Sequence, residues 1–200
     1  MTSYSFAKAS IVMSIGWGII GASSIVRAHM ADAIRRPSSE QALGKRRKAE
    51  NGAYDGGSTI VAIHSSNALR ARMFSNVLRI PHAYSNLDQM LARRDIQCVY
   101  VANHPRNHAH AVLAALDAGK HVLCEAPLAL SVTIAEEARY KATLRGLLLG
   151  INAPWRADPA IQRLQQLIID REIGDLLGGR IVNAGLLPLA QQGWRLLPNG

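Results

Sequence analysis

The sequence predicts an α/β fold, in which a doubly wound parallel Rossmann sheet is followed by an incomplete second α/β domain. Two observations predict the sheet: short apolar runs alternate with segments of helical apolar spacing, and no internal repeat interrupts that alternation. The second domain is expected because 200 residues exceed the needs of one core, while the last strand-like run stands alone.

The first half of the chain contains three predicted strand and helix units. SIGWGII (14–20) is a short apolar strand that ends at Gly21, and the helical spacing of the next segment begins at Ser23 or Ser24, either of which suits a helix cap. The later units pair strand 59–65 with helix 67–78, and strand 80–85 with helix 87–94.

The second half continues the same alternation. Strand 97–103 precedes helix 108–119, which Gly119 ends in the usual C-terminal position. The next predicted elements are strand 121–126, helix 131–144, strand 146–152, helix 159–174 and strand 178–187.

These elements divide the chain into two domains. A dinucleotide-binding domain is expected over 13–152, with Met13 as an alternative start that leaves residues 1–12 as an extension. Segment 36–58, rich in Pro, Ser, Gly and charge, is interpreted as a surface insertion in that domain. Residues 153–200 are expected to begin a truncated second domain.

Composition favours a cytoplasmic protein. No apolar run is long enough to cross a membrane, and Cys98 and Cys124 lie in apolar runs as expected of buried, reduced thiols. The net charge of +9 is concentrated at 35–48, so a basic interaction protein is one alternative, but only 5% of residues are aromatic and nucleic acid is not the expected partner. His104, His108 and His110 lack an accompanying acid, so no metal site is predicted.

Two turns are candidates for binding a nucleotide, because ligands of parallel sheets bind beyond the carboxyl ends of the strands. GIIGASSI retains Gly21 of the dinucleotide fingerprint, with Ser23 and Val26 at the other two glycine positions, and suits either a phosphate turn or a plain strand-to-helix turn. HSSNALR has no acid, so Ser65, Ser66 and Arg70 suit a ribose 2′-phosphate, although an ordinary helix cap with a surface arginine explains the same residues.

Three segments resemble a known family, the oxidoreductases typified by glucose–fructose oxidoreductase and inositol dehydrogenase, and in particular its anhydrofructose reductases. The matching residues are GWGIIGASSI (16–25), VYVANHPRNHAHAVLAALDAGKHVLCEAPLAL (99–130) and GWRL (193–196). The resemblance covers about residues 13–196 and implies an NADP-dependent reductase that acts on a sugar-like carbonyl substrate.

The resemblance also implies the cofactor contacts, and its 2′-phosphate pocket agrees with the independent interpretation of HSSNALR. A cis peptide before Pro127 is implied as well. The implied cofactor-binding residues, including the turn glycine, are Gly21, Ala22, Ser23, Ser24, Ile25, Ser65, Ser66, Arg70, Ala102, Asn103, His104, Asn107, Glu125, Asn152, Trp194 and Arg195.

Departures from the family pattern predict impaired turnover. The family has Glu-Lys-Pro where this chain has Glu125, Ala126 and Pro127, and the lysine implied by the resemblance assists proton transfer to the substrate carbonyl. An Asp and a His of the family lie beyond Gly200, so no catalytic residue is assigned, and self-association is expected of a truncated domain. A non-catalytic nucleotide-binding module and a basic interaction protein remain the alternatives.

Overall fold

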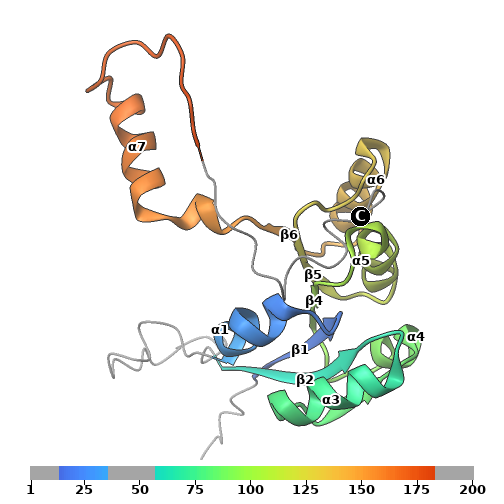
Figure 1. The fold of residues 1–200 in the computed structure, drawn as a ribbon. Coiled ribbons are helices and arrows are strands. Elements are labelled where there is room, and N and C mark those ends of the chain that lie inside the picture. The colour runs from blue at the N-terminus through green and yellow to red at the C-terminus, as the bar shows by residue number, and fades with distance from the viewer. Residues whose placement is uncertain (1–13, 36–56, 183–200) are drawn as a thin grey trace, which may run out of the picture. The chain divides into compact units, whose positions relative to one another are not determined.

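The structure, a computed structural model, describes residues 14–35 and 57–182. Six parallel strands form one sheet in the order β3-β2-β1-β4-β5-β6, and the chain reverses its direction of winding between β3 and β4 (Figure 1). The predicted doubly wound α/β fold is therefore confirmed. The strands are β1 Ile15–Ile20, β2 Ser58–His64, β3 His82–Tyr84, β4 Cys98–Val101, β5 His121–Glu125 and β6 Leu149–Asn152.

Helices connect the strands, as the alternating pattern predicts. They are η1 Val26–Met30, α1 Ala31–Arg35, α3 Ala68–Leu78, α4 Leu87–Leu91, η2 Pro105–Asn107, α5 His108–Asp117 and α6 Val132–Leu144. The chain divides into two compact units, and the first unit ends at Asn152. In the second unit, η3 Pro154–Ala157 precedes α7 Pro159–Ile169.

The sheet has a hydrophobic core on each face. Neighbouring residues of β1 supply opposite cores: Ile20 packs with residues of α4, α5 and α6, whereas Ile19 packs with residues of η1, α1 and α3. Figure 1 shows α5 and α6 together beside β4 and β5. Burial on both faces explains why the strands are continuous apolar runs without alternating polar residues.

Three local predictions are wrong within the described residues. Ser24 and Ile25 are already helical and lead into the π-helical η1, which has no side-chain cap, and the buried Ser23 hydroxyl has no hydrogen-bond partner. The predicted strand 178–187 is not formed over 178–182, and its remainder lies outside the described residues. Cys98 is half-buried, whereas Cys124 is fully buried.

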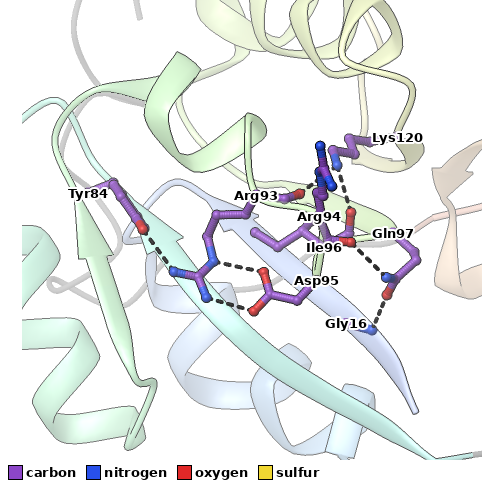
Figure 2. Close-up of polar contacts among 8 residues, drawn as sticks. All are labelled: Gly16, Tyr84, Arg93, Arg94, Asp95, Ile96, Gln97 and Lys120. Carbon is purple, nitrogen blue, oxygen red and sulfur yellow. Dashed lines mark hydrogen bonds and ion pairs between the residues drawn. The ribbon is translucent and has the colours of Figure 1, made fainter. Parts of the chain in front are cut away.

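Figure 2 shows how polar side chains fasten the loop between α4 and β4 at the amino ends of the strands. The ammonium group of Lys120, a residue only 9% exposed, donates to the carbonyl oxygens of Arg93 and Ile96, each at 2.8 Å. Burial lowers the pKa of Lys120. The Gln97 side chain accepts from the Gly16 amide at 2.7 Å and donates to the Arg94 carbonyl at 3.2 Å, which joins the loop to β1.

We expect Lys120→Met to lower the free energy of unfolding by roughly 2–4 kcal/mol, because it leaves two loop carbonyls without their donor. The matched control is Lys141→Met, which removes an ion pair with the exposed Asp117. Urea denaturation of both variants measures the difference. If the free energy of unfolding falls equally in the two variants, the structural role of Lys120 is contradicted.

Candidate functional site

The carboxyl ends of β2, β1 and β4 meet at the turn that follows β1. The Gly21 amide donates to the His64 carbonyl at 2.9 Å, and the Ala102 amide donates to the Ile20 carbonyl at 2.8 Å. These two hydrogen bonds continue the sheet to its last residues. Side chains that follow the three strands are thereby brought to one edge.

Gly21 is required at this turn for two reasons. Its φ of +113° is unfavourable for other residues, and an added Cβ atom would lie 2.4 Å from the Asn103 amide nitrogen. The backbones of the β1 turn and the β4 loop therefore approach more closely than any side chain allows. The positive φ agrees with the tight turn that the sequence pattern predicts for the first glycine of a phosphate turn.

Three buried polar atoms at this edge have no hydrogen-bond partner among the described residues: Ser23 Oγ, His64 Nδ1 and Asn103 Oδ1. Burial lowers the pKa of His64. An unsatisfied buried polar group costs about 1–3 kcal/mol. A ligand with hydroxyl, amide or phosphate groups fits this edge because it can supply the absent partners.

The segment after β2 places an arginine against the β1 turn. Asn67 caps α3 by accepting from the Arg70 amide at 2.9 Å, so the helix cap is neither Ser65 nor Ser66. Arg70 Nε donates to the Ala22 carbonyl at 2.9 Å, and its guanidinium lies 5.8 Å from the centre of the Phe74 ring. These contacts fix the guanidinium beside the turn while using only one of its nitrogens.

Beyond β5 and β6, one carboxylate is held from two sides. Tyr100 donates to Glu125 Oε1, and Asn152 Nδ2 donates to the same oxygen at 2.6 Å. Asn152 Nδ2 also lies 3.9 Å from Met30 Sδ. Burial, and then the hydrogen bond to Glu125, raise the pKa of Tyr100 far above its usual range, so the phenol remains a donor.

The turn after Glu125 is accessible but lacks an acid or base at its centre. Ala126 and Pro127 are exposed, and the peptide bond between them is cis, as expected. Burial and the nearby Glu125 charge raise the pKa of the Cys124 thiol to about 12, so this neighbour does not ionise near neutral pH. The turn can therefore present backbone groups and Glu125, but no titratable side chain at residue 126.

The structure brings the predicted residues of the first unit to the carboxyl edge, where they form the turn after β1, the start of α3, the loop after β4 and the ends of β5 and β6. His104 accepts from the Arg106 amide at 3.3 Å and thereby caps η2, which Asn107 ends. Trp194 and Arg195 lie outside the described residues. Sequence reasoning missed the contributions of Tyr100 and Phe74, because an aromatic residue in a strand or helix ordinarily indicates core packing.

The described residues contain no cluster of three His, Cys, Asp or Glu side chains arranged to hold a metal ion. Over the same ranges, every helix is too short or too polar to cross a membrane.

Comparison with known proteins identifies the family. The sequence model of the oxidoreductase family with an NAD-binding Rossmann fold matches residues 15–152, which include every strand of the sheet. The chain belongs to this family. The resemblance that the sequence motifs indicated is thus confirmed.

Individual members of the oxidoreductase family match at moderate identity. The 1,5-anhydro-D-fructose reductase of Ensifer adhaerens is 32% identical over 180 residues, which are 90% of this chain and 48% of that protein. The 3-ketoreductase KijD10 of Actinomadura kijaniata, solved with NADP and TDP-benzene, is 27% identical with a TM-score of 0.63, over 78% of this chain and 42% of that chain.

A third member shares the fold at lower identity. The scyllo-inositol dehydrogenase of Lactobacillus casei, solved with NAD(H) and scyllo-inositol, is 21% identical with a TM-score of 0.64, over 81% of this chain and 43% of that chain. This chain thus spans about half the length of the relatives that it matches.

We expect Gly21→Ala to lower the free energy of unfolding by roughly 2–4 kcal/mol, because a methyl group adds a clash to the strain of positive φ. Gly119→Ala is the matched control: φ is +72° there, but the added Cβ has no neighbour within 4 Å, so strain of about 1 kcal/mol acts alone. Urea denaturation measures the free energy of unfolding of both variants. If Gly119→Ala lowers it as much as Gly21→Ala does, the close approach of the two backbones is refuted.

Proposed function

We propose that the first unit binds NADP(H) along the carboxyl edge of its sheet. The observation that carries the proposal is the set of three unpartnered buried atoms, Ser23 Oγ, His64 Nδ1 and Asn103 Oδ1, on three adjacent strand ends. A dinucleotide is long enough to cross several strands and carries phosphate, hydroxyl and amide groups that suit these atoms. Ser23 and the amides of the β1 turn would hold the pyrophosphate.

The phosphorylated cofactor is favoured over NAD(H) by the residues that follow β2. Ser65 and Ser66 are hydroxyl donors, whereas an acid at this place would repel a 2′-phosphate. Arg70 is oriented by the Ala22 carbonyl and the Phe74 ring, so ordering its side chain costs little on binding. Because the solved relatives contain NADP in one case and NAD(H) in another, the choice rests on this chain's own residues.

The nicotinamide half is assigned to the ends of β4, β5 and β6, since the strand order places them on the far side of the β1 turn from Arg70. A bound nicotinamide supplies hydride for reduction of a carbonyl. Glu125 would accept a ribose hydroxyl, because Tyr100 and Asn152 donate to one carboxylate oxygen and leave the other for the ligand.

The proposed ancestral reaction is reduction of a sugar-like carbonyl, with turnover that is impaired or absent in this chain. Ala126 cannot donate a proton to the carbonyl oxygen, and the neighbouring Cys124 is fully buried with its thiol donating to the Glu125 carbonyl at 3.2 Å. A nucleotide-binding module without catalysis is the second candidate, which the exposed methyl group of Ala126 favours.

The proposal also covers the location of the protein in the cell and its self-association. The unpaired thiols of Cys98 and Cys124 support a cytoplasmic location, where thiols stay reduced. Self-association is proposed on the exposed apolar side chains of the second unit, among them Leu164 and Ile169 of α7. The dispersity of the protein in light scattering tests the latter proposal.

Wild-type protein is expected to bind NADPH roughly tenfold or more tightly than NADH, and Arg70→Leu is expected to remove most of that difference, because the 2′-phosphate is the cofactor group that the guanidinium is proposed to contact. Arg72→Leu is the control, since Arg72 is exposed on the same helix. Fluorescence titration measures the dissociation constants. Equal wild-type affinity for the two cofactors would refute the 2′-phosphate pocket.

Steady-state NADPH oxidation by the 200-residue chain, with ketose or dicarbonyl substrates, is expected at background, because a positioned acid typically contributes ~10²- to 10⁴-fold. Ala126→Lys in the 200-residue chain is expected to leave the rate of NADPH oxidation at background. Ala126→Lys in a fusion to the substrate-binding part of the Ensifer adhaerens reductase should raise turnover above the same fusion with Ala126. Robust oxidation by the unmodified chain would show that another group carries the proton.

A further inference from the structure

His108 links two segments of the candidate site that the sheet does not connect. It is the first residue of α5 and is 1% exposed. Its Nδ1 atom lies 2.7 Å from the Pro127 carbonyl oxygen, and its Nε2 atom lies 3.0 Å from the Asn103 carbonyl oxygen. The imidazole ring therefore spans the gap between the loop after β4 and the turn after β5.

The sheet ladder ends before this gap. The last paired residues of β4 and β5 are Val101 and Cys124, so Asn103 and Pro127 lie beyond the last pair. The loop after β4 is held on its other side by the close approach of Gly21, and Glu125 is held by Tyr100 and Asn152. The His108 ring joins the two segments directly.

The chemistry of the contact accounts for a histidine at this position. Both partners are carbonyl oxygens, which only accept hydrogen bonds, so a side chain that bridges them must present N–H groups in two directions. An imidazole ring offers its two nitrogens on opposite sides of a rigid plane; the imidazolium form donates to both carbonyl oxygens, and each neutral tautomer donates to one of them. Leucine has a similar volume but no donor, whereas glutamine keeps two N–H groups on a single flexible nitrogen.

We propose that His108 is a positioning residue that sets the separation between the Asn103 loop and the turn formed by Glu125, Ala126 and Pro127. The proposal rests on the proposed function, in which these two segments flank the nicotinamide half of the cofactor. The 2′-phosphate pocket lies beyond β1 at the end of β2, and His108 contacts none of its residues. Loss of the bridge is therefore expected to weaken binding of the nicotinamide half and to leave binding of the adenosine 2′-phosphate half unchanged.

The test compares His108→Leu and His108→Gln with His110→Leu, which removes an exposed histidine from the same helix. Two ligands are titrated: NADPH, and adenosine 2′,5′-bisphosphate, which lacks the nicotinamide half. His108→Leu is expected to weaken NADPH binding roughly tenfold and to change the bisphosphate affinity by less than about twofold. His108→Gln is expected to restore part of the NADPH affinity, and His110→Leu to change neither ligand.

Hydrogen exchange without cofactor measures the bridge itself. In His108→Leu, backbone amides of 102–107 and 124–130 are expected to exchange faster than in wild type and in His110→Leu. If His108→Leu does not fold, His108→Gln is compared with wild type in the same two measurements, with a smaller change of the same sign expected.

The outcomes separate this inference from the proposed function. Equal weakening of both ligands by His108→Leu, or unchanged NADPH affinity with unchanged exchange, overturns the positioning role while the proposed function stands. If the wild type binds neither NADPH nor the bisphosphate, the proposed function fails, and the assignment of His108 to the nicotinamide half fails with it.

Discussion

The close approach of the β1 turn to the β4 loop is the constraint on which the candidate site depends. Gly21 has no side chain, so its backbone lies against that of Ala102 and Asn103, where an added Cβ atom would lie 2.4 Å from the Asn103 nitrogen. This approach brings the ends of three strands to one edge. A larger residue would separate Ser23 from Asn103 and divide the surface on which a dinucleotide can lie.

The two edges of the sheet differ in how their polar groups are satisfied. At the amino ends, Lys120 and Gln97 donate to carbonyl groups of the α4–β4 loop, and Gln97 accepts from the Gly16 amide of β1. At the carboxyl ends, Ser23, His64 and Asn103 each bury an atom without a partner. Since buried polar groups in folded proteins are normally hydrogen-bonded, this difference supports the proposed nucleotide site at the carboxyl edge independently of any relative.

The turn after β5 combines a well-oriented carboxylate with an unreactive centre. Glu125 receives two donors on one oxygen, and His108 holds the Pro127 carbonyl. Between them, Ala126 offers only a methyl group, and the buried thiol of Cys124 has a pKa raised to about 12. The turn thus orients Glu125 and the Pro127 carbonyl around a residue without an acid or base, which supports the proposed binding without catalysis.

The sequence by itself determined the order of strands and helices, because apolar periodicity and turn glycines are local properties. It also indicated the ends of β1 and β2 as a nucleotide site, since the turn residues and the absent acid can be read directly. Only the tertiary structure decided that Arg70 is held by Ala22, that Tyr100 donates to Glu125 and that His108 bridges two loops. Each of these contacts joins segments that are distant in sequence, and their geometry depends on strand register and helix packing, which no local pattern specifies.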